Sequence, residues 1–244
     1  MRVPRAHFAG PLASGRRVEL PEATAHHCLR VLRLRDGATV RLFNGEPGDW
    51  LARLVVHGKS SAAAEVDGFE PRASESPLAV TLVQGISRGQ RMDYTLEKSV
   101  ELGIGTIVPV FMDRTQAPPR GERVEKKTRH WRGVVEAAAA QSGRTRLPDV
   151  ASPVTFGAWI ASAEPGDRPH LLLDPEADRG AAGLGTPAAL TLIAGPEGGF
   201  SPQERSAALA AGCRGMRLGP RVLRTETAAV AALSLLQGLY GDIG

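Results

Sequence analysis

The chain has 244 residues, 42% of them hydrophobic, which allows one large globular domain or two small ones. Its net charge of +4 rests mainly on arginine, which suits phosphate and base contacts, while only 5% aromatic residues argue against a module that binds single strands by stacking alone. The two cysteines lie far apart in sequence, which argues against a disulfide framework and a metal site. The sequence has neither an apolar leader nor an apolar run of membrane-spanning length, so we expect a cytoplasmic protein without a membrane partner.

The first 70 residues favour a small β-barrel of short strands. Asn44-Gly45 is a strong hairpin signal, and a single helix is expected over residues 22–32. The basic residues between Arg16 and Arg35 fit an RNA-binding surface about as well as a solvated face. Strands are expected at residues 16–20, 38–43, 50–56 and 62–69.

A polar, proline-flanked segment at residues 71–77 is typical of a linker. After it, strands alternate with helices, which predicts an α/β domain with a largely parallel sheet whose ligands bind beyond the carboxyl ends of the strands. The absence of GxGxxG and GxxxxGK[ST] patterns weakens a nicotinamide or nucleoside-triphosphate function. Strands are expected at 78–84, 104–111, 170–173, 190–194 and 215–218, and helices at 88–102, 124–141, 201–211 and 226–240.

The segment LIAGPEGGFSPQE, residues 192–204, combines a strand end, a tight glycine turn and a helix start. Ser201 is a natural N-cap, Pro202 suits the first helical position, and Glu204 completes a capping box. Adjacent glycines let the backbone approach a ligand closely. Taken alone, a plain turn between a strand and a helix explains the segment equally well.

A second segment, LGPRVLRTETAAVAA at residues 218–232, repeats this pattern. Gly219-Pro220 ends a short apolar segment, and a loop with Arg221 and Arg224 leads to a helix that we expect to be capped at Thr225. Two such turns can share one edge of a sheet and form a single site.

These two segments resemble the RsmE family, within the SPOUT class of RNA methyltransferases. The resemblance extends through VPRAHF, HHCLRVLRLRDGATVRLFNG, LVQGISRGQRMDYTLEKSVELGIGTIVPV and HWRGVVEAAAAQSGRTRLPDV, so it covers nearly the whole chain. It implies an α/β fold with a PUA-like β-barrel RNA-binding domain at residues 1–72 and a trefoil-knotted SPOUT methyltransferase domain at residues 73–244. It also implies a homodimer that uses S-adenosyl-L-methionine to methylate N3 of one uridine in small-subunit (16S) ribosomal RNA.

Such a reaction requires a cofactor cradle, a device that favours the uracil anion and a grip on RNA phosphates, because N3 carries a proton and lies on the pairing edge. We expect Arg224 to stabilise negative charge on a uracil oxygen, with Glu226 or Glu197 taking the proton or orienting Arg224. A turn-stabilising role fits Glu197 equally well, and helix capping is an alternative for Thr225 and Glu226.

Two further sets of contacts follow from the resemblance. Cofactor contacts are expected at Leu173, Ala194, Gly195, Gly199, Leu218, Gly219, Leu223 and Thr225. Phosphate contacts are expected at Arg5, Arg30, Arg33, Arg91 and Arg144.

Two alternatives stay open. A ribose 2′-O methyltransferase of the same class is the nearer one, although such relatives typically carry a serine–asparagine segment where this chain has residues 224–227, RTET. A non-catalytic RNA-binding assembly factor is the other, although the intact loops argue against a degenerate pocket.

Overall fold

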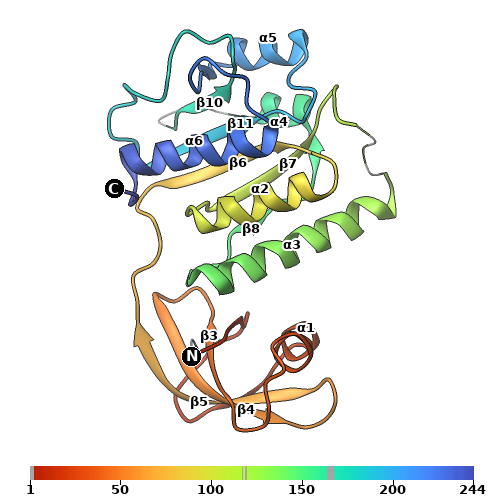
Figure 1. Cartoon of the computed structure of the whole chain (residues 1–244), viewed down its shortest axis with the longest axis vertical. Helices are drawn as coiled ribbons and strands as arrows, with labels where there is room; N and C mark the ends of the chain where they lie inside the picture. Colours follow the sequence, from red (N-terminus) through yellow and green to blue (C-terminus); the bar gives the residue numbers. More distant parts are fainter. Residues whose placement is uncertain (1–2, 117, 119, 164–167) are drawn as a thin grey trace. The chain divides into compact units, whose positions relative to one another are not determined.

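The computed structural model describes residues 3–116, 118, 120–163 and 168–244 (Figure 1). Contacts within the chain divide it into two compact units. Unit 1 runs to Glu75 and also takes in Ala139–Leu147, and unit 2 consists of Ser76–Ala138 and Pro148–Gly244.

Unit 1 is built on a five-stranded sheet in the order β1-β3-β4-β5-β2. Alternating side chains of β3 and β4, including Val40, Leu42 and Leu54, are buried in its core. The β3–β4 pair is antiparallel, which confirms the hairpin predicted at Asn44-Gly45. The strands are β1 (Arg5–His7), β2 (Arg17–Glu19), β3 (Thr39–Phe43), β4 (Gly48–Val56) and β5 (Ala62–Pro71).

The helix expected over residues 22–32 takes two forms. Helix α1 (Glu22–His26) passes directly into a π-helical turn, η1 (His27–Val31). Arg33 follows with a φ of 54°, the only positive φ of a non-glycine residue among those the structure describes. The short strand β1 was not predicted, because it is defined by its parallel pairing with β3, which no local pattern reveals.

Unit 2 is built on a seven-stranded sheet in the order β12-β10-β11-β6-β7-β8, with β9 also paired to β7. All pairs among the described strands are parallel, as predicted. The strands are β6 (Ala79–Gly85), β7 (Thr106–Phe111), β8 (Asp149–Val150), β9 (Val154–Thr155), β10 (His170–Leu173), β11 (Ala189–Ala194) and β12 (Arg214–Met216). The helices are α2 (Gln90–Glu101), α3 (Glu122–Ser142), α4 (Phe156–Ser162), α5 (Pro202–Ala210) and α6 (Thr225–Tyr240).

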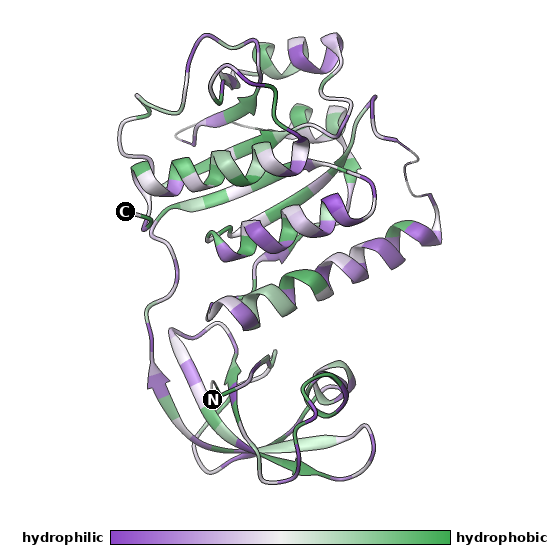
Figure 2. Cartoon of the chain, viewed as in Figure 1, coloured by the Kyte–Doolittle hydropathy of each residue, from purple (hydrophilic) through white to green (hydrophobic). Residues whose placement is uncertain are grey.

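Hydropathy explains how these layers form. Figure 2 shows hydrophobic colour along the sheet of unit 2 and mixed colour along its helices. Helices α2 and α6 lie side by side on one face of the sheet, and α6 also contacts β10 and β11 (Figure 1). Strands that are covered on both faces of a parallel sheet consist of continuous apolar residues. Accordingly, Leu171, Leu172 and Ile193 are each at most 1% exposed.

The register of the central strands brings their carboxyl ends to one edge. Leu172 of β10 pairs with Ile193 of β11, and Ala194 pairs with Gln84 of β6. On the other side of β10, Leu173 pairs with Met216 of β12. The loops that follow these strands therefore meet at a single place.

Candidate active site

A cleft of about 960 Å³ lies where the loops after β10, β11 and β12 meet in unit 2. Its size suits a ligand of nucleoside dimensions. It brings together every residue predicted to bind the cofactor or act in catalysis, together with Arg91. These are Leu173, Ala194, Gly195, Glu197, Gly199, Leu218, Gly219, Leu223, Arg224, Thr225 and Glu226.

The turn after β11 requires glycine for two reasons. Gly199 has a φ of +68°, in the left-handed region that favours glycine. A Cβ on Gly195 would lie 3.2 Å from the carbonyl carbon of Gly199, so a side chain there would crowd the backbone and force it to shift by a few tenths of an ångström. The turn thus presents bare backbone beside the apolar side chains of Leu173 and Leu218, a lining that fits a cofactor held largely through backbone contacts.

A capping box fixes the start of α5, as predicted. The Ser201 hydroxyl accepts from the Glu204 amide at 3.2 Å, and Glu204 Oε2 accepts from the Ser201 amide at 2.8 Å. The same two side chains bind Asp113 after β7: its amide donates to Glu204 Oε1 at 2.9 Å, and its carboxylate accepts from the Ser201 hydroxyl at 2.6 Å. The glycine turn is therefore anchored to a second strand end.

Thr225 does not cap α6, so that prediction was wrong by one residue. The N-cap is Arg224, and Thr225 is the first helical residue. Its hydroxyl instead donates to the Gly195 carbonyl at 2.6 Å and lies 3.3 Å from Gln84 Nε2, which donates to it. Thr225 thereby joins the start of α6 to the glycine turn. It can do so because the loops after β11 and β12 meet at this edge of the sheet.

Gln84 is a site residue that the sequence analysis missed. It is fully buried at the end of β6, and its Nε2 lies 3.4 Å from the Gly195 carbonyl. Within the described residues its Oε1 has no hydrogen-bond partner. A glutamine at the end of an otherwise apolar strand was the available signal, since buried polar side chains require partners.

Glu197 is held by the loop and helix that follow β6. Its Oε1 accepts from the Arg88 amide at 2.8 Å and from Arg91 Nη1 at 3.1 Å. Burial raises the pKa of Glu197, but the hydrogen bonds from Arg88 and Arg91 and the charge of Arg91 outweigh it and hold the pKa below its ordinary value. Glu197 is therefore an ionised, well-anchored carboxylate at neutral pH, which favours its alternative role in stabilising the turn.

Glu226 lies in the same cleft with fewer contacts. Its Oε1 lies 3.9 Å from Arg91 Nε, and its buried Oε2 has no hydrogen-bond partner among the described residues. Arg224 is exposed and, in the part of the chain described, pairs with neither glutamate. The arginine between the two carboxylates is Arg91.

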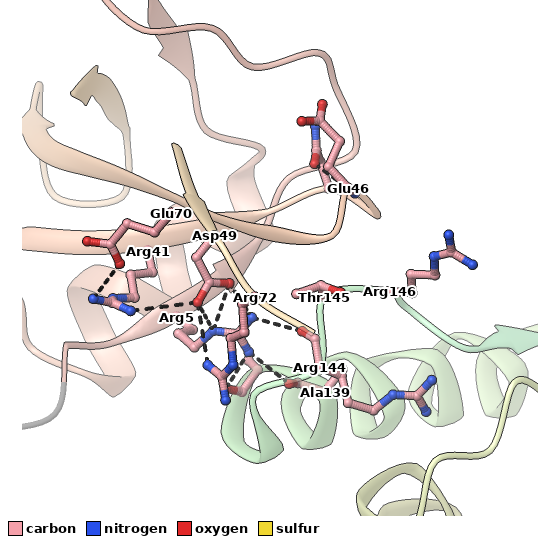
Figure 3. A network of polar contacts seen from close by, with 12 residues as sticks. Arg5, Arg41, Glu46, Asp49, Glu70, Arg72, Ala139, Arg144, Thr145 and Arg146 are labelled. Atoms are coloured by element: carbon pink, nitrogen blue, oxygen red, sulfur yellow. Dashed lines mark hydrogen bonds and ion pairs between the residues drawn. The ribbon is translucent and has the colours of Figure 1, made fainter. Parts of the chain in front are cut away.

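Two arginines predicted to contact phosphate are buried and engaged with protein partners. Arg5 is 6% exposed, and its guanidinium donates to Asp49 and to the carbonyls of Ala139 and Arg144 (Figure 3). Arg144, also 6% exposed, donates its Nε to Glu75 at 3.1 Å. Burial and these charged partners favour a structural role for both guanidinium groups over phosphate binding.

The other predicted phosphate contacts keep accessible side chains. Arg30 and Arg33 are exposed in unit 1, at and just after the π-helical turn. Arg91 is 45% exposed in unit 2 but engaged with Glu197. In the part of the chain that the structure describes, no group of three or more His, Cys, Asp or Glu residues is arranged to hold a metal ion, and no helix is long and apolar enough to cross a membrane.

Comparison with known proteins supplies independent findings. The family profile described as RNA methyltransferase domain matches residues 74–237, and that described as RNA methyltransferase PUA domain matches residues 20–67. The Ribosomal RNA small subunit methyltransferase E of Mycobacterium bovis is 36% identical over 219 residues, covering 85% of this chain and 80% of the relative. Its namesake from Synechocystis is 32% identical over 229 residues, covering 91% and 73%.

Solved structures agree. A Ribosomal RNA small subunit methyltransferase E from Neisseria gonorrhoeae, bound to S-adenosyl methionine, shares 36% identity with a TM-score of 0.91 and full coverage of both chains. A methyltransferase from Legionella pneumophila in complex with the cofactor SAM shares 33% identity with a TM-score of 0.93, covering 99% of this chain and 100% of the other. These likenesses confirm the predicted fold class, a SPOUT-type α/β methyltransferase domain with a parallel sheet and an N-terminal PUA-like domain.

Proposed function

Because the chain belongs to the ribosomal RNA small subunit methyltransferase E family, we propose that it methylates N3 of one uridine in small-subunit ribosomal RNA, using S-adenosylmethionine. The observation that supports this most is the single cleft that gathers the three strand-end loops around Glu226 and Arg224. Both solved relatives described above contain this cofactor.

The cofactor would lie in the cradle of the glycine turn, against Leu173 and Leu218. When bound, S-adenosylmethionine supplies a methyl group on a sulfonium sulfur, which becomes a neutral thioether once the N3 lone pair has formed the new bond to carbon. The close backbone approach at Gly195 and the left-handed φ of Gly199 and Gly219 explain why these positions carry no side chain.

Two residues of the protein would remove the N3 proton and stabilise the resulting uracil anion. Glu226 is the proposed proton acceptor, because its buried Oε2 has no partner among the described residues and its carboxylate lines the cleft. Arg224, exposed at the N-cap of α6 and also lining the cleft, would stabilise negative charge on a uracil carbonyl oxygen as the proton leaves. Arg224 and Glu226 both lie at the start of α6, so the helix fixes the distance between their backbone positions.

The proposal divides labour between residues 1–72, which would bind RNA, and residues 73–244, which would hold the cofactor and the reacting base. Exposed Arg30 and Arg33 would contact phosphates. A homodimer is part of the proposal: Leu235 and Leu239 lie one turn apart on α6 and are 42% and 49% exposed, an apolar pair that a second copy would cover. A cytoplasmic location follows from the proposed substrate.

The test is nucleoside mass spectrometry of small-subunit RNA, free and in assembled subunits, after incubation with the protein and isotopically labelled cofactor. We expect labelled N3-methyluridine at one position. Labelled 2′-O-methyl nucleoside would instead support the ribose methyltransferase. RNA binding without methylation, and without cofactor binding in calorimetry, would support the non-catalytic assembly factor.

A further inference from the structure

Arg91, in the first turn of α2, lies between two glutamates that come from separate parts of unit 2. Its Nη1 donates to Glu197 Oε1 at 3.1 Å, in the turn after β11. Its Nε lies 3.9 Å from Glu226 Oε1, in the first turn of α6. One guanidinium therefore connects three segments around the cleft.

We propose that Arg91 is a positioning residue that orients Glu226 for proton transfer, which assigns it a role in the chemistry rather than in phosphate binding. The inference rests on the proposed function. Because Nε and Nη1 lie on different edges of the planar guanidinium, Arg91 bridges two carboxylates instead of chelating one. It engages one oxygen of each glutamate and leaves the second oxygen, which is buried, without a partner in the described part of the chain.

The unpartnered Oε2 atoms of Glu197 and Glu226 indicate where a substrate donor would bind. Buried carboxylate oxygens without donors are uncommon in folded proteins and require an explanation. Glu197 Oε1 also accepts from the Arg88 amide at 2.8 Å, so Glu197 serves as a fixed point against which Arg91 is held. Arg91 in turn fixes Glu226, whose free oxygen then faces a donor that the substrate provides, the N3–H of an extruded uracil.

The charges around the cleft make Arg91 the relevant cation for both glutamates. Arg114, which follows β7, donates to the Gly198 carbonyl at 3.0 Å, and Arg224 precedes α6; neither is paired with Glu197 or Glu226 in the described structure. Without Arg91, the pKa of Glu197 would rise, because burial would be opposed by fewer hydrogen bonds. Glu197 would then be less ionised, and neither carboxylate would be held by Arg91.

The experiment compares Arg91→Gln and Arg91→Lys with Lys98→Gln. Lys98 is a suitable control because it lies on the same helix, carries the same charge, and donates its amine to Glu97 and Glu101 at 2.7 and 2.8 Å, away from the cleft. For each variant, kcat is measured at saturating RNA and cofactor across the pH range. RNA affinity against salt, cofactor affinity by calorimetry and thermal melting are measured on the same preparations.

We expect Arg91→Gln to lower kcat by roughly 10²-fold near neutral pH, the lower range for loss of acid–base catalysis. The defect should shrink as pH approaches the ionisation of uracil N3, where a proton acceptor is no longer needed. Cofactor affinity and the salt slope of RNA binding should stay at wild-type values. Arg91→Lys should show a smaller defect with the same pH trend, because it keeps the positive charge although one ammonium cannot bridge both carboxylates. Lys98→Gln should match the wild type.

A defect in Arg91→Gln that is equal at every pH and accompanied by a lower salt slope would overturn the proposal and assign Arg91 to phosphate binding. A wild-type kcat would overturn it as well. If Arg91→Gln does not fold, Arg91→Lys decides, and wild-type kcat in that variant at every pH contradicts the proposal. A wild-type protein that forms no N3-methyluridine would instead reject the proposed function itself.

Discussion

Two of the arginine–carboxylate clusters in the described residues, one from each unit, differ in burial and in how their oxygens are bonded. In unit 1, Asp49 is 1% exposed and accepts from Arg5 (Figure 3), while Glu75 accepts from Arg144 and from two backbone amides. In unit 2, Glu197 and Glu226 face a cleft and each keeps a buried oxygen without a partner in the described structure. Arginines and carboxylates thus form a structural cluster in unit 1, where the carboxylates are hydrogen-bonded within the protein. In unit 2 they form a site whose carboxylates keep an oxygen available to a ligand.

The largest expected effect is on chemistry in the cleft. Glu226→Gln removes the proposed proton acceptor but keeps its shape, so kcat should fall by about 10²- to 10⁴-fold while cofactor binding survives. Glu176→Gln is the matched control, because that carboxylate also lines the cleft but is 80% exposed. Labelled methyl incorporation measures both. Equal activity in the two variants would remove Glu226 from the chemistry.

The next effect tests the buried cluster of unit 1. Asp49→Ala leaves Arg5 buried without its carboxylate, which should lower the free energy of unfolding by about 3–5 kcal/mol. Asp67→Ala breaks the Arg53–Asp67 pair, whose side chains are 62% and 37% exposed, and should cost at most about 1 kcal/mol. Urea denaturation compares the two. Similar losses would mean that burial does not distinguish these pairs.

Acid stability offers a related test at Glu75. Burial raises the pKa of Glu75, but Arg144 and the amides of Arg146 and Thr145 outweigh it and lower the pKa below the ordinary 4.5. A depressed pKa means that its stabilisation is present above pH 4.5 and is lost as pH falls through the lower folded value. Glu75→Gln should therefore cost about 1.5–3 kcal/mol at neutral pH and flatten the loss of stability below that point. An unchanged pH profile in denaturation would contradict this role.

The glycine turn of the cleft provides a binding test. Gly199→Val forces a β-branched residue to a φ of +68°, at a strain of about 1–3 kcal/mol, so cofactor affinity should fall roughly tenfold or more while the fold survives. Calorimetry measures the affinity and circular dichroism the fold. Gly133→Ala, on the exposed side of α3 with no atom near the added Cβ, should bind normally. Wild-type affinity in a folded Gly199→Val protein would remove this turn from the cradle.

The smallest effect concerns the exposed arginines of unit 1. Arg30→Gln and Arg33→Gln should each weaken RNA binding and reduce its salt slope by about one unit, because each removes one phosphate contact. Arg53→Gln, an exposed arginine on β4 outside the predicted surface, should leave the slope unchanged. Filter binding at several salt concentrations gives the slopes. An equal reduction in all three would mean that general charge, rather than a defined surface, attracts the RNA.

The sequence predicted the sheet and the cleft well because both depend on local signals. Apolar runs fixed β10 and β11, and the Ser201–Glu204 capping box fixed the start of α5. Strands of two residues, such as β8 and β9, carry no periodicity and were missed. The contact of Arg5 with Ala139 joins residues 134 positions apart, which no local pattern reveals.

The arginines show the same limit within the site. Nothing in the sequence distinguishes Arg5, Arg30 and Arg91 from one another. Tertiary contacts make Arg5 a buried structural residue, leave Arg30 exposed and pair Arg91 with two glutamates. Thr225 is similar: its place near a helix start predicted a cap, whereas its hydroxyl bonds to the carbonyl of Gly195, 30 residues away. Residue type and spacing predicted which loops form the site, and packing decided what each side chain does there.

The most direct measurement is a crystal structure of the protein with S-adenosylhomocysteine and a uridine-containing RNA fragment of the small subunit. We predict an extruded uracil in the cleft, with N3 within hydrogen-bond distance of Glu226 Oε2, a carbonyl oxygen against Arg224, and Arg91 paired with both glutamates. A uracil bound outside the cleft, or one whose N3 faces neither glutamate while its ribose faces the cofactor, would contradict the proposed mechanism.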